Sequence, residues 1–131
     1  MQQYATLDLL VRADSGFAKP EIYAACEEAE AKFTIRLKAN PKLQRIAEHK
    51  IHFGQPGKDF AEEDVQWHRL TNYQPDTWER AYTVIIKSTR PAGELLFKHE
   101  FIVTNLELAF TSDIFELYYQ RGAIGRFDQR S

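Results

Sequence analysis

Cysteine is almost absent from this sequence: Cys26 is the only one in 131 residues, so the chain cannot form an internal disulfide. A lone cysteine fits a reducing cytoplasm. The sequence also lacks an apolar run of about 18 residues, the length that a membrane-spanning helix needs. Nor does it begin with a basic segment followed by an apolar run, the pattern of a secretory signal. We therefore expect a cytoplasmic protein without a membrane anchor.

A strong net charge is missing too, because the formal charge is −2, and composition therefore does not predict a nucleic-acid binder. The charge is nevertheless uneven. Residues 32–50 hold six basic side chains and one acid, or 6 − 1 = +5. The basic residues of this segment are Lys32, Arg36, Lys38, Lys42, Arg45 and Lys50. Two interpretations stay open: a surface that faces phosphates, or the solvated face of an ordinary helix, which the residues alone favour.

The first 52 residues have the pattern of an α/β unit. Leu7 to Ala13 is an apolar run that ends at the turn signal Asp14-Ser15-Gly16, which predicts a buried strand. Proline and acid at the start predict a helix from about Pro20 to Ala31. Phe33 to Lys38 alternates apolar and polar residues, as a strand does, and Lys42 to Ile51 predicts a short basic helix. Strand, helix and strand in this order predict two parallel strands.

The pattern changes in residues 53–110, where Val65–Leu70, Ala81–Ser88 and Glu94–Leu106 predict three strands with short connections. Such strands form an antiparallel sheet. The N-cap cluster Thr111-Ser112-Asp113 and the helical spacing after it predict a terminal helix over residues 111–131. The fold class is thus α/β at the start and α+β overall, in a single domain of residues 1–131.

Four aromatic side chains gather in the middle of the chain: Trp67, Tyr73, Trp78 and Tyr82. They could stack on unpaired bases, as aromatic residues of nucleic-acid-binding proteins do. Aromatic residues of strands usually pack a sheet core, however, so we favour the core.

Two segments of the sequence carry a resemblance to a known family. The first reads LVRADSGFAKPEIYAACE, with FTIRLKANPKL just after it, and the second reads FIVTNL followed by IFELYYQRGAI. Together they resemble the DDE transposases of bacterial insertion sequences, in the group that has a β-rich insertion in an RNase H-like core. The resemblance extends from about Leu7 to Ile124. It implies a partial RNase H-like core of strand, helix, strand and terminal helix, with an inserted antiparallel β segment, in a bacterial protein.

The resemblance also implies a chemistry. This family cuts and joins DNA ends with two Mg²⁺ or Mn²⁺ ions, which three carboxylates hold. Asp14 ends its strand as the family's second metal-binding aspartate does, so it is the expected catalytic residue and metal ligand. The family's last carboxylate lies on a helix that reads Tyr, two residues, Arg, three residues, Glu, six residues, Lys. Tyr118 and Arg121 match its start and are expected to contact transposon-end DNA, as are Lys38, Lys42 and Arg45 of the basic segment.

The sequence departs from the family at both ends of the pattern. The glutamate position falls on Gly125, and the lysine position would follow Ser131. Only thirteen residues precede Asp14, too few for the strand of the family's first aspartate. Asp128 could replace the glutamate if the helix continued, although we do not favour this. We therefore expect a transposase fragment that is inactive alone.

Two alternatives remain. The chain could be a non-catalytic DNA-binding or regulatory remnant, or a small α+β protein with a metabolite pocket whose resemblance to the family is coincidental. Asp14 itself could be structural and only cap its turn. Because missing core strands would leave an open sheet edge, a homodimer is also possible.

Overall fold

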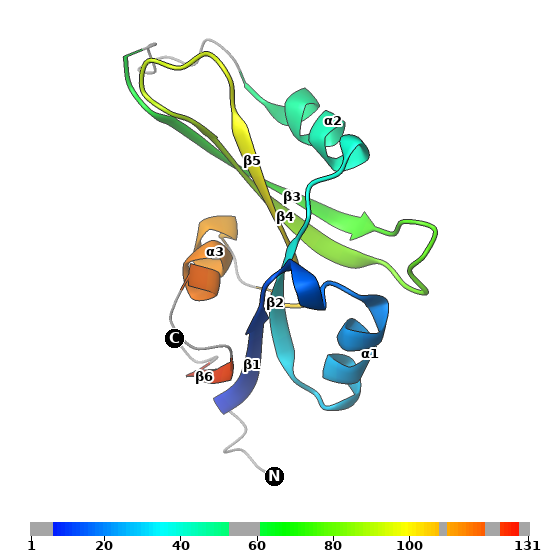
Figure 1. Cartoon of the computed structure of the whole chain (residues 1–131). Helices are drawn as coiled ribbons and strands as arrows, with labels where there is room; N and C mark the ends of the chain where they lie inside the picture. The colour runs from blue at the N-terminus through cyan, green and yellow to red at the C-terminus, as the bar shows by residue number, and fades with distance from the viewer. Residues whose placement is uncertain (1–6, 53–60, 108–109, 120–123, 129–131) are drawn as a thin grey trace.

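A computed structural model of the protein describes residues 7–52, 61–107, 110–119 and 124–128. Six strands form one mixed sheet in the order β3-β4-β5-β2-β1-β6. Helices α1 and α2 lie on one face of the sheet and α3 lies on the other (Figure 1). In chain order the elements are β1 (Leu7–Ala13), the 3-10 turn η2 (Ser15–Phe17), α1 (Pro20–Glu28), β2 (Lys32–Leu37), α2 (Pro41–Lys50), β3 (Asp64–Tyr73), β4 (Tyr82–Arg90), β5 (Lys98–Thr104), α3 (Thr111–Tyr119) and β6 (Ile124–Asp128).

The first elements confirm the predicted βαβ unit, because β1 and β2 pair in parallel from Leu10↔Lys32 to Ala13↔Ile35. Pro20 begins α1, where its fixed φ and missing N–H are harmless. The helix ends at Glu28, three residues before the predicted end. Glu30 has the left-handed φ of 56°, which a helix cannot contain.

The three middle strands are antiparallel, as predicted, but they do not form a separate sheet. Strand β5 pairs with β4 on one side and with β2 on the other, from Thr34↔Thr104 to Leu37↔Phe101. The β-rich segment therefore extends the sheet of the βαβ unit. The result is an α+β fold that is compatible with a partial RNase H-like core. Among the described residues, no helix is both long and apolar enough to cross a membrane.

Two polar residues after β5 complete the hydrogen bonding of β2. The amide of Asn105 accepts from the Phe33 N–H at 2.8 Å and donates to the Ala31 carbonyl at 3.1 Å. The Thr104 hydroxyl donates to the Phe33 carbonyl at 2.7 Å. The Asn105 side chain thus takes the place of a neighbouring strand where β5 has ended. It satisfies backbone groups that burial would otherwise leave unpaired. The Thr-Asn pair of the FIVTNL segment therefore has a structural role.

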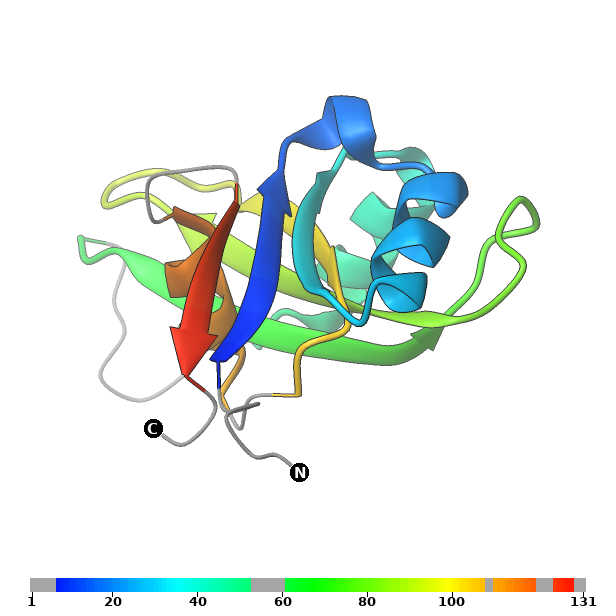
Figure 2. The ribbon, with the colours of Figure 1, turned by 90° about the horizontal axis from the view of Figure 1, so that it is seen from below.

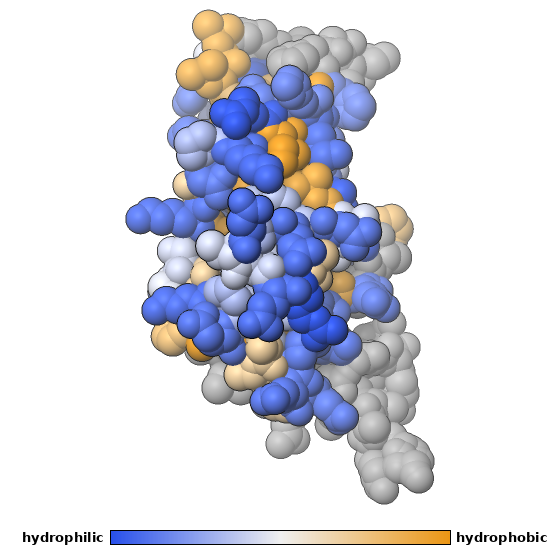
Figure 3. All heavy atoms as spheres, turned by 90° about the vertical axis from the view of Figure 1, so that its right-hand side faces the viewer, coloured by the Kyte–Doolittle hydropathy of each residue, from blue (hydrophilic) through white to orange (hydrophobic). Residues whose placement is uncertain are grey.

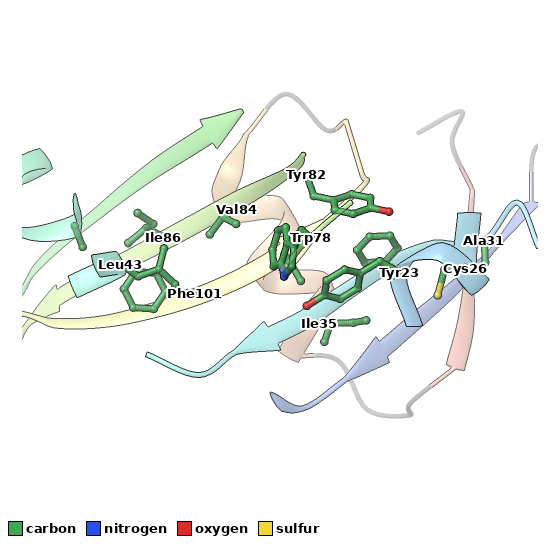
Figure 4. Packing of buried hydrophobic residues seen from close by; sticks show 13 residues of the cluster. Tyr23, Cys26, Ala31, Ile35, Leu43, Trp78, Tyr82, Val84, Ile86 and Phe101 are labelled. Carbon is green, nitrogen blue, oxygen red and sulfur yellow. The ribbon is translucent and has the colours of Figure 1, made fainter. Parts of the chain in front are cut away.

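The core consists of two clusters, one on each face of the sheet. Strand alternation separates them, because Val84 and Ile86 face α1 and α2 while Ile85 faces α3. On the α1 and α2 face, Tyr23 packs against three aromatic rings with centroids 5.3–5.5 Å away (Figure 4). These rings belong to Phe33, Trp78 and Tyr82. The preference for core packing is therefore confirmed for Trp78 and Tyr82, which are buried, but Trp67 is partly exposed.

The predicted terminal helix is wrong for residues Ile124–Asp128, which form the strand β6, while the described part of the helix, α3, ends at Tyr119. Strand β6 lies beside β1 (Figure 2) and pairs with it in antiparallel register from Leu7↔Asp128 to Val11↔Ile124. Glycine costs about 1 kcal/mol relative to alanine in a helix, so Gly122 and Gly125 weaken a long helix. The edge of β1 offers backbone partners instead. This pairing also covers part of the edge on which the expected homodimer rested.

A histidine cluster lies where the end of α2 meets the sheet. The rings of His52 and His68 are 5.9 Å apart, and the Nε2 atom of His68 is buried without a hydrogen-bond partner among the described residues. Burial lowers the pKa of His68, and the nearby Lys50, His52 and His99 lower it further. Protonation of His68 is therefore less favourable in the folded protein than in the unfolded chain.

We predict that acid weakens the fold through His68. Because its folded pKa lies below the ordinary value of about 6.5, its contribution to stability is complete above that pH and is lost as the pH falls towards the folded pKa. Urea denaturation at about pH 7.5 and about pH 5.5 should show a loss of stability that is smaller in His68→Gln. An equal loss in the variant would contradict this origin.

Candidate functional site

Asp14 directly follows β1, at the end of the parallel pair. Its backbone is extended, and its Oδ1 atom accepts a hydrogen bond from the Gly16 N–H at 3.1 Å. The carboxylate therefore caps the turn η2. A β-carbon on Gly16 would lie 3.3 Å from this oxygen, so the glycine leaves room for the cap. The side chain is exposed, and a carboxylate can bind a further partner through its second oxygen.

A hollow of about 410 Å³ opens beside Asp14. Strand β6 pairs with β1 only as far as Val11, so the last residues of β1 border this hollow. It is lined by Val11, Arg12, Ala13, Asp14, Phe17, Ile22 and Tyr118. The structure thus brings Asp14 of the first sequence segment together with Tyr118 of the second, more than 100 residues away.

Arg12 joins β1 to the end of α3. Its Nη1 atom donates to the backbone carbonyl of Tyr118 at 2.7 Å, and its guanidinium lies 5.6 Å from the centre of the Tyr118 ring. Carbonyls in the last turn of a helix have no partner within the helix, and a cation there also complements the helix dipole. The Tyr118 ring is buried, so this residue fixes the position of α3 with respect to Asp14.

The described residues do not fit a pair of metal ions. Asp14 is the only acidic residue that lines the hollow. Across the described part of the chain, no group of three or more His, Cys, Asp or Glu side chains could hold a metal ion. Asp14 can therefore provide one ligand, whereas two-metal chemistry needs several carboxylates around both ions.

Two residues that the sequence analysis considered for the last carboxylate lie in strand β6, away from Asp14. Gly125, the position expected for the glutamate, pairs with Leu10 in β6 and does not lie on a helix. Asp128 pairs with Leu7 at the opposite end of β1. Asp14 is seven positions after Leu7 along extended backbone, or about 23 Å. Asp128 therefore cannot stand in for the lost glutamate at this site.

The basic residues chosen from the sequence lie outside the hollow. Lys38 follows β2, while Lys42 and Arg45 lie on α2, and all three are exposed. The Nζ atom of Lys42 lies 5.9 Å from the centre of the Tyr73 ring. The molecular face formed by α1 and α2 is largely hydrophilic (Figure 3). Arg121 lies outside the described residues.

A serine, a histidine and a glutamate form a chain of hydrogen bonds elsewhere in the molecule. His99 Nδ1 lies 2.7 Å from Ser88 Oγ, and its Nε2 lies 2.6 Å from Glu48 Oε2. The residue types are those of a hydrolase triad, but the imidazole is reversed, because in a triad the serine bonds Nε2 and the acid bonds Nδ1. Ser88 is also 0% exposed, so no substrate carbonyl can reach its hydroxyl. The chain of bonds instead attaches α2 to β4 and β5.

Sequence reasoning missed a set of cations that the sheet brings together on the α3 side. Arg36, Arg69 and Lys87 come from three different strands, and strand register places them on the same face of the sheet. The signal that could have found them is strand alternation. Along each strand, the basic residue is next to core residues that face the opposite side of the sheet.

The chain was compared with known families, curated proteins and solved structures. A family model described as "Transposase DDE domain group 1" matches residues 1–127. No curated protein and no solved structure matches the chain.

The cap at Asp14 leads to a prediction that separates its charge from its hydrogen bond. Asp14→Asn keeps an oxygen that can accept from the Gly16 N–H, whereas Asp14→Ala removes it. We expect Asp14→Ala to lower the free energy of unfolding by about 1 kcal/mol, and Asp14→Asn to lower it by less. Urea denaturation measures both, and an equal loss in the two variants would show that the cap contributes nothing.

Proposed function

Because the chain belongs to the transposase DDE domain family, we propose that Asp14 is a metal-binding carboxylate of a centre that cuts and joins DNA ends. The observation that carries this proposal is the convergence at the hollow. Asp14 directly follows β1, the strand next to the edge strand β6, and Tyr118 of α3 lines the same hollow. Arg12 bonds the two elements together, which supports a site built between β1 and the end of α3.

We further propose that this chain does not cleave DNA by itself. In two-metal phosphoryl transfer one ion activates the attacking oxygen, and the other stabilises the leaving oxygen. Mg²⁺ and Mn²⁺ prefer oxygen ligands, and shared carboxylates keep two such ions close together. Asp14 alone can bind one ion weakly. The glycine at position 125 supports the same conclusion, because it has no side chain to act as a ligand.

A second candidate function is non-catalytic binding of duplex DNA, through which the chain would regulate an intact transposase. The surface of α2 supports it. Lys42 and Arg45 are three residues apart and exposed on this helix, and Lys38 lies just before it. Flexible lysines and forked arginines are the side chains that contact backbone phosphates.

Metal binding and cleavage at Asp14 can be tested separately. With Mg²⁺ or Mn²⁺, the purified chain should nick supercoiled plasmid DNA no faster than Asp14→Asn does, because a single carboxylate cannot hold both ions. Mn²⁺ should nevertheless broaden the NMR signal of the Gly16 amide in the wild type and not in Asp14→Asn. Nicking that requires Asp14 would refute inactivity, and the absence of broadening would refute the metal ligand.

Duplex binding by the basic segment gives another prediction. Reversing Lys38, Lys42 and Arg45 to glutamate should abolish a salt-dependent shift of duplex DNA, because each lost phosphate contact lowers the salt slope by about 1. The matched control compares Arg45→Glu with Lys19→Glu, an equal change of charge at an exposed residue outside the segment. Equal weakening in the two single variants would mean that only net charge matters, and no shift at low salt would remove the candidate.

A further inference from the structure

The α3 side of the sheet carries a concentration of positive charge. Register aligns Trp67, Lys87 and Glu100 in one row across β3, β4 and β5. The next row holds Arg69 at one end and Arg36 at the other, with the apolar residues under α3 between them. By register, the strands contribute six basic residues to this face: Arg12, Lys32, Arg36, Arg69, Lys87 and Lys98. Against Asp8 and Glu100 of the strands and Asp113 and Glu116 of α3, the count of positions is 6 − 4 = +2.

Two exposed aromatic rings lie on this charged face, with a lysine between them. The Nζ atom of Lys87 is 5.4 Å from the centre of the Trp67 ring and 5.3 Å from that of Tyr119. Trp67 is 36% exposed and Tyr119 is 47% exposed. Below them, the buried ring of Phe115 lies 5.4 Å from Trp67 and supports it from the core side. The hydroxyl of Tyr119 donates to Glu100, which pairs with Arg36 at 3.3 Å, so the ring is held in place.

These side chains border a hollow of about 280 Å³. It is lined by Trp67, Lys87, Ser112, Phe115, Glu116 and Tyr119. These groups match what a nucleotide offers: flat rings stack on a base, an ammonium pairs with a phosphate, and the hydroxyl of Ser112 and the carboxylate of Glu116 bind polar groups. Lys87 now rests on the ring faces, and it can move to a phosphate when a base takes its place.

We propose that Trp67, Lys87 and Tyr119 form a stacking site for an unpaired base of single-stranded DNA. This site is separate from Asp14 and from the basic surface of α2, because none of its residues lines the first hollow or belongs to that helix. A duplex hides its base faces in the stack, so the rings select for unpaired bases. The choice of DNA over RNA as the polymer rests on the proposed function.

The contrast with the other aromatic residues supports this assignment. Trp78 and Tyr82 are buried in the core on the opposite face of the sheet, and they gain their stability from burial. Trp67 leaves a third of its surface in water, on a strand whose neighbours place Lys87 beside it. Lys42 makes a similar contact with Tyr73 beside α2, which provides a matched control.

The experiment uses a short oligothymidylate and a duplex of equal length at low ionic strength. Binding of the oligothymidylate should quench the fluorescence of the wild-type protein, because Trp67 is its exposed tryptophan. Trp67→Ala should weaken this binding by about 5- to 150-fold, since stacking of one base is worth about 1–3 kcal/mol. Trp67→Phe should retain most of the affinity, because phenylalanine still offers a ring.

The lysine variants separate this site from the duplex surface. Lys87→Gln should weaken oligothymidylate binding several-fold, while Lys42→Gln should leave it unchanged and affect only the duplex. Thermal unfolding of each variant shows whether it folds, and the quenching of the wild type tests the site without any substitution. The proposal is overturned if the oligothymidylate neither binds nor quenches, or if folded Trp67→Ala and Lys87→Gln bind it as the wild type does. If the protein bound the oligothymidylate but not the duplex, the stacking site would be supported, and only the proposed duplex-binding surface of α2 would be refuted.

Discussion

The pairing of β2 with two neighbours of opposite direction is the constraint on which the rest of the structure depends. Parallel pairing with β1 places Asp14 at the carboxyl end of the two parallel strands. Antiparallel pairing with β5 attaches the three β-rich strands. The middle of β2, from Phe33 to Ile35, is buried on both faces, so its backbone groups need partners. Asn105 and Thr104 provide partners where β5 ends. A single sheet results, and α3 lies against it within reach of β1.

This arrangement gives the two faces of the sheet different properties. The face under α1 and α2 holds the larger aromatic cluster, and its polar chain through His99 attaches α2. The face under α3 holds a smaller apolar cluster between rows of basic side chains. The large core provides stability, and α3 leaves aromatic rings of its own side open to solvent. The hollow beside Asp14 and the hollow beside Trp67 are therefore both lined in part by α3.

The sequence predicted those helices and strands that have a strong local signal, such as a proline at the start or strict alternation. Pro20 marked the start of α1, and alternation in Phe33 to Lys38 marked a strand. The helix prediction failed for Ile124–Asp128, because a helical spacing of residues continued past Gly122 to Ile124. The edge of β1, which no local pattern reveals, provided hydrogen bonds for a strand instead. The place of Asp14 at the end of β1 was predictable from the sequence. Tyr118 was known only as a match to the family pattern, and the fold was needed to show that it lies near Asp14.

By itself, the sequence determined the parallel βαβ unit, the antiparallel strands and the position of Asp14, because each depends on residues that are near one another in the chain. Only the tertiary structure decided that the strands share one sheet, that Arg12 bonds α3, and that Lys87 lies between Trp67 and Tyr119. The reason is physical. Strand register and helix packing join residues tens of positions apart, and both are set by the burial of all the elements together.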